Sequence, residues 1–365
     1  MLQPLQPARL RASLSAVLGL PARAFGVGRV AELSPGLSGS RLFRIEVHDP
    51  EQGTRTLILK VPDWGTPTGL DPRDSWVSRR EIHFYESGLT ARLPPGLRAP
   101  GFLGVDRAGP GTWLWLEDAG SAMRVAWGPV EAVTAARRAA RLHRLFLDER
   151  ESLTQQPWLE RGGDAAFAHH VPAGHRNLET LPGHHYWSGL LSAEERQALH
   201  RALDLSGRAV MAMHALPVSL AHGDFHIRNL GFDSSGDLVA LDWAHVGLAP
   251  PGCDVATLVS LYTGMGGAGD MRPGGPLEQS VMAAYLDELG TVMQTGGPAA
   301  RELRAAVRRA AALWHLTWGL HLRLGPGLDW LLRRPDPLSP AATAEAASIR
   351  DGCLRAVSAL GYLES

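Results

Sequence analysis

The chain reads HGDFHIRN from 222 to 229 and LVALDW from 238 to 243, and these two segments are the most informative part of the sequence. Asp224 lies five residues before Asn229, and a second aspartate, Asp242, ends an apolar run typical of a strand. Phosphoryl transfer needs a carboxylate that reaches an acceptor hydroxyl, and an amide oxygen and a second carboxylate that hold Mg²⁺ against phosphates. The spacing therefore predicts Asp224 as the catalytic residue, with Asn229 and Asp242 as metal ligands.

Lysine is the rarest charged residue in this sequence. Of 36 basic residues, 35 are arginine and Lys60 is the only lysine. Lys60 follows the apolar run 57–59, where no glycine-rich turn precedes it, so a Walker A loop and the P-loop NTPases are excluded. The sequence predicts a β-hairpin that ends at Lys60. Its first strand has alternating apolar residues over 43–47, its turn lies at 49–53, and its second strand contains the apolar run 57–59.

The 222–229 loop resembles the H-R-D-x-x-x-x-N loop of protein kinases, but with Gly223 in place of the arginine. This H-G-D form is similar to that of aminoglycoside phosphotransferases, choline kinases and their relatives, and the resemblance continues to PPGCD at 250–254. In protein kinases the arginine at this position usually binds a phosphorylated residue of the activation loop. Only eleven residues separate Asp242 from Asp254, too few for a long regulated segment. The resemblance implies an ATP-dependent kinase of small molecules rather than of proteins.

The same resemblance implies roles for residues outside the loop. Lys60 is expected to bind the α- and β-phosphates of ATP, and Glu81, on a predicted helix at 79–86, to form an ion pair with it. Asp254 is expected to brace the backbone of the 222–229 loop, and His222 to support it.

Two further segments resemble nucleotide-binding parts of the family. The loop of Ser38, Gly39 and Ser40 is similar to the phosphate-covering loop, although it lacks the full G-x-G-x-x-G pattern. The stretch 114–119 is similar to the hinge between the lobes, where backbone groups near Glu117 and Ala119 would contact adenine.

These features predict an α+β, protein-kinase-like fold with two lobes. We expect a β-rich nucleotide-binding lobe over 1–118, with strands at 103–105 and 113–116, and a helical lobe with the substrate site over 119–365. The apolar residues near 8–20 recur at helical spacing, which favours an amphipathic leader helix over a signal peptide.

In the second lobe the sequence predicts helices and short strands. Breaker-free residues at 130–147 predict a long helix, and Ser192 with Glu195 predicts a capping box for a helix that continues to His214. The Gly-, Pro- and His-rich segment 162–189 has no period, so we expect a solvated loop near the substrate site. Short strands at 220–223, 229–232 and 238–242 and mostly helical structure after 253 complete the prediction.

Alternative functions rest on weaker patterns. His222, Asp224 and His226 could form a zinc site of a metallohydrolase, although the glycine between them and the strand–loop–strand setting do not match a helical zinc motif. Residues 26–31 match G-x-G-x-x-A, but no strand precedes them, so a dinucleotide site is disfavoured. The histidines of 169–185 match no zinc spacing. A nucleotide-binding module without catalytic activity also remains an alternative.

Composition limits the partners. The net charge is −1 and no apolar run is long enough for a membrane span, so neither nucleic acid nor membrane is expected to bind. Residues 1–150 hold 20 basic and 15 acidic groups, whereas 151–365 hold 16 and 22, which favours a polyphosphate on the first lobe and a cationic acceptor on the second. Two cysteines without metal spacing fit a reducing cytoplasm. The sequence does not identify the acceptor, a role in antibiotic resistance, the preference for ATP or GTP, or the oligomeric state.

Overall fold

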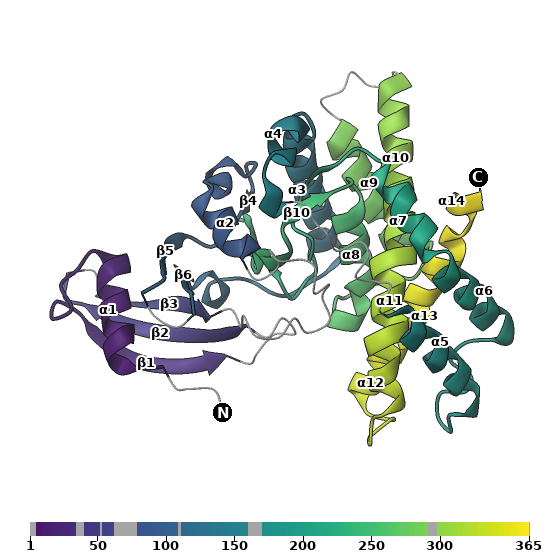
Figure 1. Cartoon of the computed structure of the whole chain (residues 1–365), viewed down its shortest axis with the longest axis horizontal. Coiled ribbons are helices and arrows are strands. Elements are labelled where there is room, and N and C mark those ends of the chain that lie inside the picture. Colours follow the sequence, from purple (N-terminus) through teal and green to yellow (C-terminus); the bar gives the residue numbers. More distant parts are fainter. Residues whose placement is uncertain are drawn as a thin grey trace.

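The computed structural model describes residues 5–33, 40–51, 53–61, 79–108, 111–159, 170–290 and 298–364. The chain forms a small lobe built on an antiparallel sheet and a larger, mainly helical lobe, which lie at opposite ends of the long axis in Figure 1. The predicted two-lobed α+β fold class is confirmed.

Five strands form the sheet of the small lobe, in the order β1-β2-β3-β6-β5, and every neighbouring pair is antiparallel. The strands are β1 Gly26–Leu33, β2 Arg41–Asp49, β3 Gly53–Val61, β5 Phe102–Asp106 and β6 Trp113–Glu117. The predicted hairpin is β2–β3, in register from Arg41 opposite Val61 to Asp49 opposite Gly53.

One face of this sheet is apolar because apolar residues alternate along β2 and β3. A helix, α1 Pro7–Leu18, covers that face, and the Trp115 indole N–H donates to the Ser13 hydroxyl at 2.8 Å. The predicted leader helix near 8–20 is thus a packed part of the small lobe (Figure 1). The fully or almost fully buried side chains between them are Leu10, Leu14, Phe43, Ile45, Val47, Leu57 and Leu59.

Strand β1 was not predicted. The G-x-G-x-x-A match at 26–31 falls within this strand rather than in a turn before a helix, and the next described element is strand β2, so the described structure does not support the dinucleotide pattern. β1 is an edge strand with an irregular register between Val27 and Val30; none of its residues is fully buried and three are exposed. An edge strand of this kind shows no clear alternation of apolar and polar residues, so the sequence did not predict it.

The core of the large lobe forms around α3 Pro129–Leu147, the predicted long helix. It packs against α8 Cys253–Leu261 and α9 Pro276–Gly290 through a face of small residues, since its buried alanines let the helices approach closely. Beside α3 lie two small sheets. Their strands are β7 Ser219–Ala221 with β10 Gly247–Ala249, and β4 Leu97–Arg98, β9 Leu238–Ala240 and β8 Leu230–Phe232 in that order.

Further helices complete the fold, and none of the described helices combines the length and apolar character that a membrane span needs. They are α2 Arg80–Glu86, α4 Arg150–Thr154, α5 Val171–Thr180, α6 Ala193–Asp204, α7 Ser206–His214, α10 Pro298–Trp314, α11 Leu320–Leu322, α12 Leu328–Leu332, α13 Pro340–Ala359 and α14 Gly361–Glu364. Two π-helical turns, His315–Gly319 and Arg323–Gly327, flank α11.

The expected loop at 162–189 is wrong where it is described, because it contains helix α5. Its glycine is a packing position rather than a helix breaker: a Cβ on Gly174 would lie 3.1 Å from a methyl group of Leu203 on α6. Proline lies in the first turn of α5, where it is compatible with a helix. Residues 162–169 of the segment lie outside the described residues.

The single helix expected from Ser192 to His214 is two helices. The capping box is present, since the Glu195 N–H donates to Ser192 Oγ at 3.1 Å and the Ser192 N–H donates to Glu195 Oε2 at 2.6 Å. The helix is interrupted at Leu205, between α6 and α7. There the Ser206 hydroxyl donates to the Leu203 carbonyl at 2.7 Å, a side-chain bond that competes with regular helical bonding.

His315 is buried in the first π-helical turn and is not one of the predicted site residues. Burial, together with the positive charges of Arg355 and Arg323, lowers the pKa of His315 from 6.5 to about 3. The unfolded chain therefore binds a proton at this residue near pH 6.5, whereas the folded chain does not until about pH 3. Its contribution to stability is complete above pH 6.5 and is lost as the pH falls through this window.

We expect His315→Gln to flatten the acid-side loss of stability, because glutamine does not titrate. The slope of the unfolding free energy with pH, measured by urea denaturation between pH 6 and 4, should decrease by up to about 1.4 kcal/mol per pH unit. His185→Gln, at an exposed position, is the control and should leave the slope unchanged. Equal slopes for wild type and His315→Gln would contradict a buried, neutral histidine.

Candidate active site

The 222–229 loop joins β7 to β8 and turns sharply at Gly223. Gly223 has φ 83°, and a Cβ there would lie 2.1 Å from the carbonyl oxygen of His245. Only glycine is compatible with both the left-handed backbone and this close approach. The glycine that distinguishes the loop from H-R-D therefore has a steric cause, and it presents Asp224 directly after the turn.

Asp254 braces this loop, as the family resemblance implied. Its Oδ2 accepts the His222 N–H at 2.8 Å, and its Oδ1 accepts the Gly223 N–H at 2.9 Å. Burial opposes ionisation of this carboxyl, but the hydrogen bond of His143, supported by the Gly223 backbone N–H, lowers its pKa. A buried carboxylate thus fixes two successive backbone amides of the loop.

His143 and Tyr285 extend the brace, and the sequence analysis did not identify either. His143 Nε2 lies 3.1 Å from Asp254 Oδ2, and its Nδ1 lies 2.5 Å from the Tyr285 hydroxyl. The tautomer with the proton on Nε2 satisfies both bonds. His143 is fully buried on α3 and Tyr285 on α9. A histidine on the apolar face of the predicted 130–147 helix was the available indication.

His222 has a supporting role and does not fit a zinc site. Its Nδ1 accepts the Asp224 N–H at 3.2 Å, and its Nε2 donates to the Leu241 carbonyl at 2.9 Å. Burial is the main cause that lowers the pKa of His222, so the ring is neutral. Both nitrogens are thus used by backbone groups. No group of three His, Cys, Asp or Glu side chains in the described residues could hold a metal ion, which leaves the metallohydrolase without a site.

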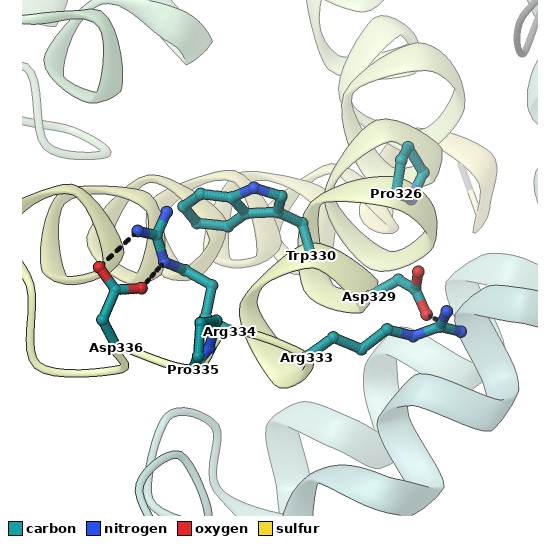
Figure 2. Close-up of a pocket in the computed structure, with 7 residues that line it drawn as sticks. All are labelled: Pro326, Asp329, Trp330, Arg333, Arg334, Pro335 and Asp336. Atoms are coloured by element: carbon teal, nitrogen blue, oxygen red, sulfur yellow. Dashed lines mark hydrogen bonds and ion pairs between the residues drawn. The ribbon is translucent and has the colours of Figure 1, made fainter.

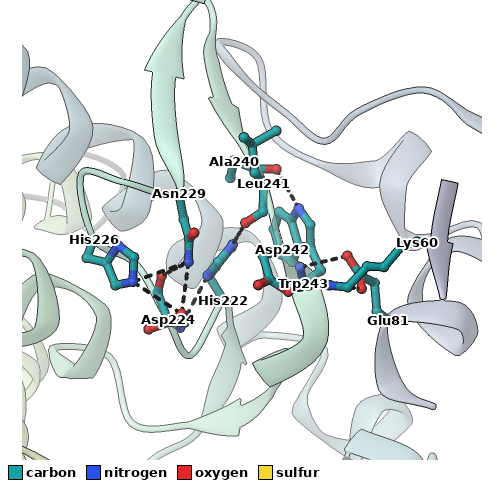
Figure 3. A network of polar contacts seen from close by, with 10 residues as sticks. All are labelled: Lys60, Glu81, His222, Asp224, His226, Asn229, Ala240, Leu241, Asp242 and Trp243. Atoms are coloured by element: carbon teal, nitrogen blue, oxygen red, sulfur yellow. Dashed lines mark hydrogen bonds and ion pairs between the residues drawn. The ribbon is translucent and has the colours of Figure 1, made fainter. Parts of the chain in front are cut away.

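Asp224, Asn229 and His226 form a compact cluster in Figure 3. Asn229 Nδ2 donates to Asp224 Oδ2 at 2.8 Å and to the Asp224 carbonyl at 3.1 Å, and His226 Nε2 lies 3.3 Å from Asp224 Oδ2. Burial alone would raise the pKa of Asp224, but the hydrogen bond and charge of His226, with a weaker contribution from His245, hold it well below its usual range. The carboxyl group is therefore ionised at neutral pH.

The second cluster, also in Figure 3, joins the two lobes. Lys60 Nζ lies 2.5 Å from Glu81 Oε2 and 2.5 Å from Asp242 Oδ1, so the ion pair expected between Lys60 and Glu81 is present. Burial opposes the charge on Lys60, but the two carboxylates raise its pKa. Lys60 in turn outweighs the burial of Asp242 and lowers that pKa. The Trp243 N–H donates to Glu81 Oε1 at 3.2 Å, which fixes α2 against the large lobe.

The β8–β9 hairpin brings the two clusters together. Asn229 directly precedes β8 and Asp242 follows β9, and the Leu241 N–H donates to the Asn229 carbonyl at 2.7 Å. Asp242 has φ 57°, the only positive value among described residues other than glycine. Amide and carboxylate oxygens are the hard donors that Mg²⁺ prefers, so the side-chain chemistry of these two residues, at the same end of the hairpin, fits a divalent cation.

The predicted nucleotide contacts are described in part. Ser38 and Gly39 lie outside the described residues, and Ser40 is buried at the start of β2. The Glu117 N–H donates to the Gly101 carbonyl at 2.9 Å, so it is not available to a ligand. Ala119 is buried and begins the short turn Ala119–Ser121, where first-turn N–H groups lack acceptors within the helix.

The histidine-rich segment, where described, contributes to packing. His175 on α5 and His200 on α6 stack with ring centroids 4.9 Å apart, and His175 Nε2 lies 3.3 Å from Asp204 Oδ1. His184 Nε2 lies 3.2 Å from the Leu332 carbonyl. The expected solvated loop is therefore wrong for these residues, because tertiary contacts hold them.

A separate hollow of about 510 Å³ lies at the end of α12 and contains none of the predicted site residues. Figure 2 shows that its charges pair with one another: Arg334 with Asp336 at 2.7 Å and Arg333 with Asp329 at 2.7 Å. The Arg334 guanidinium lies 4.3 Å from the centre of the Trp330 ring. Because the hollow holds none of the residues of the catalytic pattern, the candidate site is the set of residues in Figure 3.

Comparison with solved structures shows the fold. An aminoglycoside phosphotransferase from Alicyclobacillus acidocaldarius matches 100% of this chain and 98% of its own, with 15% identity and a TM-score of 0.57. Amicoumacin kinase hAmiN, solved with AMP-PNP, Ca²⁺ and Ami, matches 96% of each chain with 15% identity and a TM-score of 0.54. LicA, solved with AMP, matches 99% of each chain with 13% identity and a TM-score of 0.51. The search of curated proteins found no match.

Residues 110–288 match the sequence model of the phosphotransferase enzyme family. This range contains the 222–229 loop, Asp242 and the Asp254 brace, whereas Lys60 and Glu81 precede it. The similarity to this family covers residues 110–288, and the chain has the kinase-like fold of solved aminoglycoside phosphotransferases and other small-molecule kinases.

Proposed function

We propose that this kinase transfers the γ-phosphate of ATP to a hydroxyl group of a small molecule, with Mg²⁺ as the metal. The observation that supports this best is the arrangement of charge. Asp224 is ionised and bonded to Asn229, while Asp242, across the same hairpin, is paired with the one lysine. A nucleophile-orienting carboxylate, a metal-binding pair and a phosphate-binding cation are the parts that phosphoryl transfer requires.

In this proposal Asp224 is the catalytic residue. Its pKa lies well below the usual range, so it is a weak base, but a loose transition state requires little deprotonation until bond formation is advanced. Asp224 therefore orients the acceptor hydroxyl and accepts its proton late. Asn229 and Asp242 would hold Mg²⁺, which when bound neutralises charge on the phosphate oxygens. Lys60 binds phosphate oxygens, and Glu81 keeps Lys60 in place.

We assign nucleotide binding to residues 1–118 and acceptor binding to 119–365. Ser38, Gly39 and Ser40 would cover the phosphates, and backbone groups of Glu117 and Ala119 would contact adenine. The Glu117 N–H is not available for this contact, because it donates to the Gly101 carbonyl. Solved relatives of the same fold hold AMP-PNP or AMP, which supports an adenine nucleotide here.

For the acceptor we favour a cationic alcohol, such as an aminoglycoside, an amino sugar or a choline-like amine. The excess of acidic groups in 151–365, 22 against 16 basic ones, supports this class by electrostatic attraction. The alternative, a nucleotide-binding module without catalysis, has less support because every member of the predicted catalytic set is present, from Lys60 to Asp242.

Asp224→Ala should abolish turnover, by more than about a thousandfold in kcat, while nucleotide affinity stays within about twofold of wild type. Turnover is measured by ATP consumption with an acceptor, and affinity by calorimetry. Asp148→Ala, whose side chain is 70% exposed in wild type, is the control and should behave like wild type. Undiminished turnover of Asp224→Ala would refute the assignment.

Lys60→Met should lower the unfolding free energy by about 3–5 kcal/mol, because Glu81 and Asp242 would then face each other without a counter-charge. The double variant Lys60→Met/Glu81→Gln removes one of these charges, so we expect it to be more stable than Lys60→Met alone. Urea denaturation of both variants at pH 7 measures the difference. A double variant that is equally or less stable would show that Glu81 and Lys60 are not coupled.

An ATP-consumption screen tests the acceptor class. We expect hits among aminoglycosides, amino sugars or choline-like amines in the wild type with Mg²⁺, no hits for Asp224→Ala, and loss of activity with EDTA that excess Mg²⁺ restores. Macrolides and uncharged sugars are the comparison panels, and hits confined to them would contradict a cationic acceptor. Silence on every panel from a protein that binds ATP would favour the module without catalysis.

A further inference from the structure

The described chain passes between the lobes at two points that lie against each other. One is residues 99–101, between β4, which pairs with β9 of the large lobe, and β5 of the small-lobe sheet. The other is residues 117–119, after β6. The Glu117 N–H donates to the Gly101 carbonyl at 2.9 Å, and the Gly101 N–H donates to Glu117 Oε2 at 2.8 Å. The two crossings therefore form one joint.

Arg98 connects this joint to the large lobe. Its Nη1 lies 3.0 Å from Glu117 Oε2 and its Nη2 3.4 Å from Glu117 Oε1, while its Nε lies 2.8 Å from Asp233 Oδ2. The Arg98 guanidinium thus links two carboxylates: Glu117, at the end of the small-lobe sheet, and Asp233, in the large lobe. A planar fork of this kind fixes direction as well as distance.

Asp233 is itself rigidly held. Its Oδ1 accepts the N–H groups of Ser235 and Asp237 at 3.0 and 3.1 Å, and the Ser235 hydroxyl at 2.6 Å. These bonds order the turn of the β8–β9 hairpin. The opposite end of that hairpin holds Asn229 and Asp242, the proposed metal ligands.

We propose that Arg98 is a positioning residue that fixes the adenine-contacting hinge relative to the metal-binding hairpin and thereby sets the affinity for nucleotide. The inference rests on the proposed function, in which ATP contacts the hinge at one end and Asn229 and Asp242 at the other. A nucleotide that bridges two lobes binds more tightly when their separation is fixed beforehand, since less ordering accompanies binding.

An alternative is that Arg98 stabilises the fold and nothing more. Its side chain is 32% exposed, and that of Glu117 is 43% exposed, so their pair should contribute little to stability. The two roles differ in what they change. A purely structural pair would alter the melting temperature without altering the affinity for nucleotide, whereas the positioning role predicts the reverse.

The test is calorimetric binding of Mg²⁺–ADP to the full chain and steady-state kinetics for ATP. Arg98→Gln should raise the Kd for ADP and the KM for ATP about fivefold, with kcat and the KM for the acceptor within about twofold. Arg98→Lys restores the charge but cannot make the three contacts, so its Kd should stay raised. Arg334→Gln breaks a comparable bidentate pair with Asp336, far from the joint, and should leave both constants unchanged.

Glu117→Gln is the second variant, because it keeps Arg98 and weakens only the hinge side of the contact. It should raise the Kd in the same direction as Arg98→Gln, and the melting temperatures of these variants should stay close to that of Arg334→Gln. Wild-type Kd values for Arg98→Gln and Glu117→Gln would overturn the inference while the proposed function stands. A wild-type chain that binds neither ADP nor ATP would overturn both.

Discussion

Lys60 holds a positive charge in a place that solvent hardly reaches, and such a charge is tolerated only when carboxylates surround it. Those carboxylates come from two other elements: Glu81 on α2 and Asp242 after β9. The hairpin of the small lobe, helix α2 and the large-lobe hairpin must therefore meet at one point. The relative placement of the two lobes follows from this electrostatic requirement as much as from apolar packing.

The 222–229 loop depends on a second buried charge. Asp254 accepts two successive amides of the loop, and His143 and Tyr285 on two long helices support Asp254 in turn. Catalytic side chains on a loop gain rigidity when a packed core fixes the backbone beneath them. Asp224 therefore lies on a short loop but is held by the helical core of the large lobe.

The joint at residues 98–101 and 117–119 contacts the turn end of the β8–β9 hairpin, through Arg98 and Asp233. It is built from hydrogen bonds and partly exposed ion pairs rather than from buried apolar contacts. Such contacts contribute little to global stability and leave room for adjustment on ligand binding, while they still restrict direction. The apolar core of the large lobe also includes Leu114 and Leu116 of β6, and the polar contacts of the joint add defined direction to the relation between the lobes.

Features whose residues lie close together along the chain could be predicted from the sequence. The spacing of Asp224, Asn229 and Asp242 and the β2–β3 hairpin with Lys60 at its end belong to this class, because local periodicity and motif spacing encode them. Other features were decided only by tertiary structure: edge strand β1, helix α5 in a glycine-containing segment, the interruption at Leu205, the support of Asp254 by His143 and Tyr285, and the contacts of Arg98. The physical reason is that each depends on partners distant in sequence, where packing and charge compensation override local propensity.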